Sequence, residues 1–283
     1  QWNYTLGLVY KHFHENGFDT WVISRNMLDN RQYKYQDNIK TNPKLIDYTS
    51  QEAENKFRYE RDIKTANDLN INFGLGGEYA HYTNNTLKSV YLSGTSSQLK
   101  YDTNLDLFKW SAFGQLSKSF FKQSLTLSAG ARFDANSYSS QMGNALKQFS
   151  PRFSASYEFS PGYSLNMNVG TYYQQPPYTT LGYSDASGNL VNKQNKLSYI
   201  KSNHFVLGFE WLPNSSSKFS IEGFYKIYSK YPFSVKDSVS LAGKGADFGV
   251  YGDEEVLSIG KGRSYGVELL YRSKDLFGFN VIA

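Results

Sequence analysis

The chain has 283 residues, enough for one large β-domain or two small ones. Only 40% of the residues are hydrophobic, yet 17% are aromatic, a balance that fits rings at a membrane–water interface or a tyrosine-rich secreted sandwich. The lack of Cys excludes disulfides and thiolate metal sites. No apolar run approaches the ~18 residues of a transmembrane helix. The net charge of +5 is spread along the chain, which argues against a nucleic-acid partner.

Twelve segments alternate apolar and polar residues with the period of two that is typical of β-strands. The alternation is clear in residues 124–138, where Leu125 and Leu127 share a face opposite Thr126 and Ser128. Strands are expected over residues 4–13, 19–26, 55–64, 68–83, 105–120, 124–138, 149–159, 163–174, 199–212, 218–228, 258–272 and 276–283.

The connections between these strands alternate between short and long. Short turns are expected at residues 14–18, 121–123, 160–162, 213–216 and 273–275, and longer connections at 29–54, 84–104, 139–147, 175–197 and 231–257. Outer-membrane barrels have short periplasmic turns and long external loops, with strands of about 10 or more residues, whereas sandwich strands are nearer to about 5–6. The pattern favours an all-β fold, a transmembrane antiparallel β-barrel in a bacterial outer membrane.

Residues 149–174 form a well-marked hairpin. Phe153 and Tyr157 share one face of the first arm, and Ser154 and Glu158 share the other. A turn is expected at residues 160–162, because Pro and Gly supply its backbone angles. In a barrel the apolar face meets lipid and the polar face lines the lumen.

Two motifs resemble those of a known family. One runs from Ser150-Pro151-Arg152 through Ser160-Pro161 to Gly170-Thr-Tyr-Tyr-Gln-Gln-Pro176, and the other is Gly262-Arg-Ser-Tyr-Gly-Val-Glu268. In this order they resemble recurrent motifs in the barrels of TonB-dependent receptors, and the polar, Asn-, Lys- and Tyr-rich loops are similar to those of Bacteroidetes-type receptors.

The resemblance implies a barrel of about 22 strands with a plug in its lumen. It also implies import of a scarce nutrient (siderophore, cobalamin, glycan or peptide) with energy relayed through TonB. Since about twelve strands and no plug-like region are present, residues 1–283 are expected to be part of one β-barrel domain, with no plug domain in the chain. The expected partners are outer-membrane lipid, an extracellular small ligand and, through the absent plug, TonB; a surface lipoprotein is left open.

Two aromatic-rich connections are the expected ligand-binding regions. They are residues 175–197 and 231–257, and in them Tyr178, Tyr183 and Tyr251 could stack on a sugar or a chelate. These three tyrosines are the candidate ligand-binding residues.

No motif predicts catalysis, a metal site or a cofactor. His12 and His14 lack a third metal ligand fixed by spacing, and the glycine-rich stretches lack the helix of a phosphate-binding loop. The acidic run at residues 253–255 is interpreted as a solvated loop rather than a calcium site. The chain is therefore not expected to be an enzyme.

Charged residues on the expected lumen faces are interpreted as ladders across neighbouring strands. They are Glu158, Glu210, Glu222 and Glu268 with Arg132, Arg152, Lys226 and Arg272. Two other functions stay open: a passive or structural outer-membrane pore of about twelve strands, and a secreted soluble β-sandwich that binds glycans.

Overall fold

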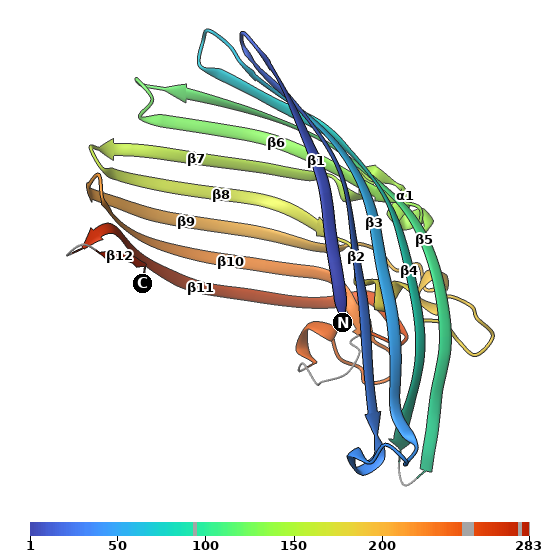
Figure 1. Cartoon of the computed structure of the whole chain (residues 1–283). Helices are drawn as coiled ribbons and strands as arrows, with labels where there is room; N and C mark the ends of the chain where they lie inside the picture. Colours follow the sequence, from blue (N-terminus) through green and yellow to red (C-terminus); the bar gives the residue numbers. More distant parts are fainter. Residues whose placement is uncertain (93–94, 245–251, 277–278, 283) are drawn as a thin grey trace.

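The computed structural model describes residues 1–92, 95–244, 252–276 and 279–282. They form one 12-stranded sheet in which each strand pairs with its neighbours in the sequence, and all pairs are antiparallel. Figure 1 shows a strongly curved sheet with β1–β5 at one side and β7–β12 at the other. The predicted twelve-stranded antiparallel barrel wall is confirmed, and the sandwich alternative is wrong because a sandwich needs two stacked sheets.

The strands are long and the helical segments are short. The strands are β1 (Trp2–His14), β2 (Gly17–Tyr35), β3 (Lys44–Lys64), β4 (Leu69–Leu92), β5 (Thr95–Phe120), β6 (Leu125–Asn136), β7 (Ser150–Ser160), β8 (Tyr163–Gln174), β9 (Ile200–Asn214), β10 (Ser217–Ser234), β11 (Val256–Leu276) and β12 (Phe279–Ile282). The connections hold η1 (Gln36–Asn38), α1 (Ser140–Gly143), η2 (Ala145–Gln148), α2 (Tyr178–Leu181), α3 (Val191–Gln194) and η3 (Leu241–Gly243). In the described part of the chain, no helix has the length and apolar character needed to cross a membrane.

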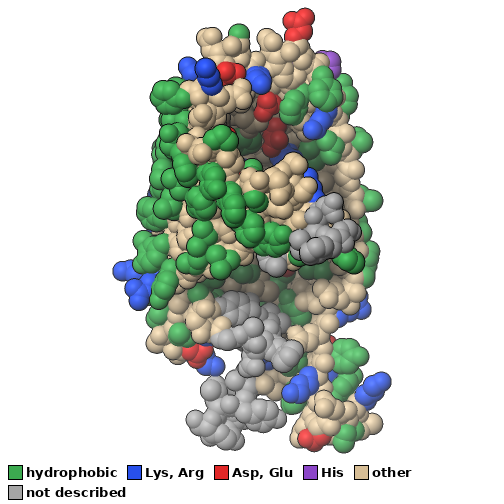
Figure 2. All heavy atoms as spheres, turned by 90° about the vertical axis from the view of Figure 1, so that its left-hand side faces the viewer, with side chains coloured by type: hydrophobic (Ala, Val, Ile, Leu, Met, Phe, Trp, Pro, Cys, Tyr) green, Lys and Arg blue, Asp and Glu red, His purple; other side chains and the backbone are tan. Residues whose placement is uncertain are grey.

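The outer face of the sheet is apolar. The register aligns one row across β7 to β11, which consists of Tyr157, Leu165, Phe209, Ile221 and Leu269. Leu269 is 74% exposed, and a contiguous apolar surface of this kind marks a face that meets lipid or another protein. Figure 2 shows hydrophobic side chains gathered over the middle of the face in view, with charged groups mainly toward its ends.

The inner face, onto which the long connections fold, is polar. Ser128, Ser154 and Asn168 lie side by side on β6, β7 and β8. On β10 and β11, however, Glu222 lies directly opposite Glu268. The prediction of opposite-charge ladders is wrong at this point, since the register pairs two carboxylates.

The short turns lie together at one end of the sheet. The turn between β7 and β8 contains Gly162, whose φ of 78° suits glycine, and a Cβ there would stand 2.6 Å from the carbonyl oxygen of Leu212. The turn expected at residues 273–275 is misplaced, because β11 continues to Leu276. Ser273 instead pairs with Val281 of β12.

Two connections that were expected to be long loops are largely strand. The predicted connection 29–54 contains the end of β2 and the start of β3, and the predicted connection 84–104 lies mostly within β4 and β5. β4 has 24 residues, which span about 80 Å at ~3.4 Å per residue, whereas the hydrocarbon core of a bilayer is ~30 Å thick. These strands therefore continue well beyond the membrane as a projecting sheet.

Candidate functional site

The long connections pack into one structure, the loop cluster, formed by the described parts of residues 137–149, 175–199 and 235–255. Its apolar core rests on side chains of the inner face of β4 and β5. The buried residues are Ala80, Tyr82, Leu105, Leu107, Tyr138, Met142, Tyr178, Leu181, Leu197, Tyr199, Leu241 and Val256. Segments far apart in the sequence thus form a shared core at the end of the barrel opposite the short turns.

Asn192, in α3, joins two of the connections. Its side chain is fully buried, and its Nδ2 donates to the carbonyl oxygens of Thr180 at 2.7 Å and Glu254 at 2.9 Å. The amide nitrogen of Val256 donates back to its Oδ1 at 2.8 Å. Buried polar groups are stable when they are hydrogen-bonded in this way, so Asn192 fixes the β8–β9 connection to the β10–β11 connection.

Asn136, at the end of β6, plays a similar part for the third connection. Its Nδ2 donates to Gln175 Oε1 and to the hydroxyl of Tyr199, both at 3.0 Å. The hydroxyl of Tyr138 donates to the carbonyl oxygen of Leu181 at 2.8 Å. These bonds hold the β6–β7 and β8–β9 connections against each other.

A charged network lies beneath the loop cluster, on the inner face of β3, β4 and β5. Lys109 Nζ lies 2.5 Å from Glu78 and 3.3 Å from Glu54. Lys56 lies 2.7 Å from Glu54 and 3.7 Å from Glu78. Tyr178, from α2, donates its hydroxyl to Glu54 at 2.6 Å and accepts a bond from Lys109. Burial and the hydrogen bond to Glu54 raise the pKa of Tyr178, so the tyrosine stays neutral and tethers the loop to the barrel wall.

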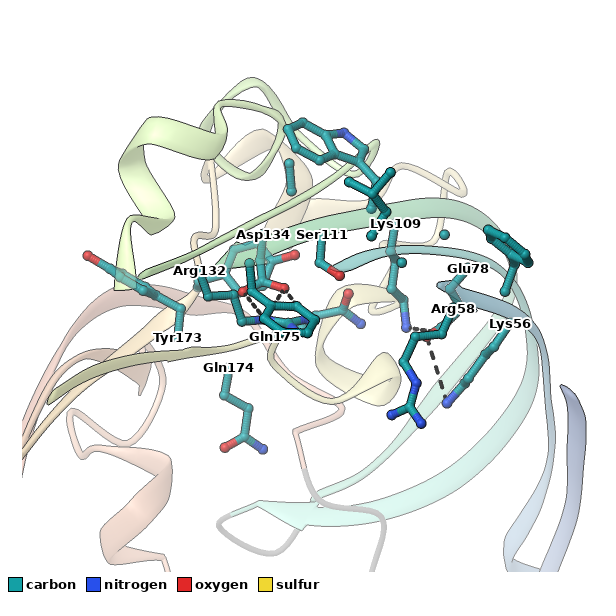
Figure 3. A pocket seen from close by; sticks show the side chains of 18 of the residues that line it. Lys56, Arg58, Glu78, Lys109, Ser111, Arg132, Asp134, Tyr173, Gln174 and Gln175 are labelled. Carbon is teal, nitrogen blue, oxygen red and sulfur yellow. Dashed lines mark hydrogen bonds and ion pairs between the residues drawn. The ribbon is translucent and has the colours of Figure 1, made fainter. Parts of the chain in front are cut away.

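A cavity of about 510 Å³ opens beside this network. Figure 3 shows its polar lining, to which Arg58, Arg132, Asp134 and Gln174 contribute. Arg132 and Asp134 form an ion pair at 2.7 Å, and Arg58 lies 3.4 Å from Glu60. Because these charges are largely paired internally, the cavity offers hydrogen-bonding groups rather than a strong field of one sign.

The structure places two of the three predicted ligand-binding tyrosines in the loop cluster. The ring of Tyr178 is buried and stacks on Tyr82 at 5.6 Å. Tyr183 is partly exposed and meets Tyr101 edge-on at 5.5 Å. Tyr251 lies outside the described residues. Their contact with a ligand stays a prediction, and Tyr183 has the more accessible ring.

The expectation of a solvated acidic run at residues 253–255 is wrong for Asp253, which is buried, and the run takes part in ion pairs. Asp253 is buried 3.4 Å from Lys88, a residue of the projecting part of β4, and Glu254 bonds Lys244 at 2.5 Å. Burial raises the pKa of Asp253, an effect that the nearby Lys88 partly opposes. Within the described ranges, no group of three His, Asp or Glu side chains is arranged to hold a metal ion.

Sequence reasoning missed the network around Lys109. Glu54 was assigned to the border of a loop, and Tyr178 is 124 residues away from it in the chain. One signal was present, since Glu54, Lys56 and Arg58 alternate with Asn55 and Phe57 as a strand with one charged face does.

A model of the family described as TonB dependent receptor-like, beta-barrel, matches residues 1–283. The solved complex of FpvAI with pyocin S2 shares the fold with a TM-score of 0.70 at 12% identity, over 100% of this chain and 40% of that chain. No curated protein matches the chain.

Two further solved structures share the fold. The pyoverdine outer membrane receptor FpvA from Pseudomonas aeruginosa PAO1, bound to pyoverdine, gives a TM-score of 0.68 at 11% identity, over 99% of this chain and 43% of that chain. The copper transporter OprC gives 0.65 at 13% identity, over 97% and 43%. The chain thus spans 40–43% of the length of these three proteins. Because the family model covers every residue and the sheet has the matching architecture, the chain belongs to the TonB-dependent receptor-like β-barrel family.

Proposed function

We propose that this chain supplies the lumen wall and the external ligand-binding surface of a receptor that imports a scarce nutrient with energy relayed through TonB. The family is one of outer-membrane barrels, and the chain lies in that membrane with its apolar outer face in lipid. The observation that carries the ligand-binding part is the loop cluster, in which three connections share one core above the inner face. The alternative, a passive pore of about twelve strands, gives no account of such a cluster.

Ligand capture on this surface has two parts. Tyr183 offers a ring for stacking on a ligand at the outside, and Tyr251 stays a candidate from the sequence alone. Tyr178 acts from beneath, because its bonds to Glu54 and Lys109 set the height of the β8–β9 connection above the cavity. The ligand then meets the polar lining below, which includes Arg58 and Gln174.

The ligand class follows by analogy from the solved relatives. Their names concern pyoverdine and copper, so a metal chelate such as a ferric siderophore is the first ligand to test. Cobalamin, glycans and peptides are the next candidates. Receptors of this kind select by groups on their loops and plug, and the loop cluster provides tyrosine rings and amides rather than a charged cage.

The complete receptor requires parts beyond this sheet. Residues 1–283 form part of one barrel domain of about 22 strands, and a plug region provides the contact with TonB. The partners are then lipid at the outer face, the ligand at the loop cluster and TonB on the periplasmic side. A surface lipoprotein would cover the loop cluster from outside.

Uptake measurements test the proposal. Cells that express the protein are supplied with radiolabelled ferric siderophores or cobalamin, with and without TonB. One ligand should accumulate only when TonB is present, and its affinity should fall when residues 183–190 are replaced by a Gly-Ser linker of the same length. Uptake that persists without TonB supports a passive pore, and an unchanged affinity after the replacement contradicts the ligand-binding role of the loop cluster.

A further inference from the structure

The outer face carries a notch between β1 and β5, centred on Gly77. Its volume is about 800 Å³. A Cβ added to Gly77 would meet no atom within 4 Å, so the notch exists because this position has no side chain. Its lining is mainly apolar or aromatic and includes Leu6, Leu8, Ile23, Phe57, Tyr79 and Phe108.

A cation stands at one end of this notch. Arg25 is exposed on the outer face and lies opposite Leu6 of β1 and Asn55 of β3. Its Nε donates to the hydroxyl of Tyr4 at 2.8 Å and its Nη1 donates to Asn55 Oδ1 at 2.7 Å. Both partners are neutral, and the ion pairs formed by arginines in the described chain belong to other residues.

The position of Arg25 along the strand indicates which leaflet it meets. β2 starts at the turn that follows β1 and projects at its far end beyond the membrane. Arg25 lies on the projecting side of Ile23, and Tyr4 and Trp2, whose rings stack at 5.6 Å, lie further along in the same direction. Tyrosine and tryptophan are typical of the membrane–water interface. Arg25 therefore sits where the head groups of the outer leaflet lie.

We propose that this notch binds a phosphorylated acyl lipid of the outer leaflet, with one acyl chain over Gly77 and a phosphate on Arg25. Arginine and lysine side chains at the edge of a membrane extend to the head-group region, where lipid phosphates are available as partners. Arginine binds phosphate with two parallel hydrogen bonds, and the two neutral partners of Arg25 hold the group without neutralising it. The site is independent of the nutrient that the loop cluster takes.

A second notch on the same face provides a matched control. It is centred on Gly223, where a Cβ would come no closer than 4.0 Å to another atom, and has a volume of about 530 Å³. Its walls are also apolar and aromatic, but they contain no cation; they include Met167, Val169, Leu207 and Val267. A leucine side chain placed in each notch in turn distinguishes a specific lipid site from general contact with acyl chains, because only the first notch has a cation beside it.

Native mass spectrometry of the protein, purified intact from outer membranes and stripped of lipid, tests the site. The probes are phosphorylated lipid A, its dephosphorylated form and phosphatidylglycerol. The occupant that we propose is lipid A, so its phosphorylated form should bind more tightly than either of the other two probes. Arg25→Gln should weaken the binding of the phosphorylated probe about tenfold, the effect of one charged hydrogen bond.

The notch variants complete the test. Gly77→Leu should lower lipid binding while Arg25 is retained, and Gly223→Leu should leave it unchanged. Heat-resistant migration of each variant on gels shows that the barrel is folded. Equal binding of the dephosphorylated form, equal effects of the two leucines, or a dimer formed through this face in place of bound lipid would overturn the proposal.

Discussion

Replacement of Asn192 by alanine is the sharpest perturbation of the loop cluster. The change removes three buried hydrogen bonds, to Thr180, Glu254 and Val256. At a net ~1 kcal/mol for each of the bonds to Thr180 and Glu254, and ~1–3 kcal/mol for the Val256 amide left without a partner, the cost is about 3–5 kcal/mol. Val256 is the first residue of β11, so the loss falls on the loop cluster and on the start of that strand.

Hydrogen exchange measures this loss directly. A cost of about 3 kcal/mol raises the opening equilibrium roughly a hundredfold, so the Val256 amide should exchange faster in Asn192→Ala by that factor, while amides in β7 and β8 stay protected. Asn195→Ala is the matched control, because Asn195 is only partly buried and bonds Glu255 and Val256 at 3.0 and 3.3 Å. It should cost less than about 1 kcal/mol. Equal exchange in the two variants would refute the role given to Asn192.

Three further changes probe the same region. Tyr178→Phe removes the hydroxyl that bonds Glu54 and Lys109; it should destabilise the β8–β9 connection by about 1–3 kcal/mol and weaken ligand binding, measured by calorimetry, and an unchanged affinity would contradict the tether. Burial raises the pKa of Asp253 above its ordinary value of 3.8, so the folded loop cluster binds the proton of this carboxyl more tightly than the unfolded one does. The hydrogen-exchange protection factors of the loop cluster should therefore fall as the pH rises from 3.8 through the raised pKa. Asp253→Asn should remove this pH dependence. Gly182→Ala brings a Cβ within 2.8 Å of Tyr82 and Thr103; limited proteolysis should cut the β8–β9 connection faster in this variant, and a rate equal to that of the native protein would show that the contact is not tight.

The sequence was most informative where one face of a strand meets lipid. Between β6 and β9 the apolar side of each strand is in contact with the bilayer, so the alternation is strong and the predicted strands agree with the structure to within a few residues. The period of two alone predicts that side chains such as Tyr157 and Phe209 take the apolar face, whereas their alignment in one row comes from the register. Lipid contact, rather than strand propensity, makes this part of the fold predictable.

The same reasoning failed beyond the membrane. In the projecting parts of β2 to β5 the outer face meets water, so the apolar half of the pattern is absent and the segment resembles a polar loop. Thr86 and Asn84, for example, are buried on the inner side of β4 and bond to each other at 2.6 Å. Two polar residues at alternate positions give no strand signal in the absence of apolar neighbours.

The candidate site was predicted only as a region. Composition identified the aromatic connection 175–197, but the contacts that shape it are long-range. Tyr178 reaches Glu54, and Asn192 reaches Val256, across large separations in the chain. Which tyrosine is buried and which is accessible depends on those contacts, so sequence alone could not distinguish Tyr178 from Tyr183.

The most direct test concerns the orientation of the barrel, since ligand capture requires the loop cluster to face the outside of the cell. Residues 1–283 contain no Cys, so a single cysteine introduced here is the only one in this part of the receptor, and the protein without it serves as the labelling control. Leu146, in the β6–β7 connection, and Phe121, in the β5–β6 turn, are each 76% exposed and lie at opposite ends of the sheet. A membrane-impermeant maleimide applied to intact cells should label Leu146→Cys at once and Phe121→Cys only after the outer membrane is permeabilised. Labelling of Phe121→Cys in intact cells, with Leu146→Cys protected, would contradict both the orientation and the receptor function that depends on it.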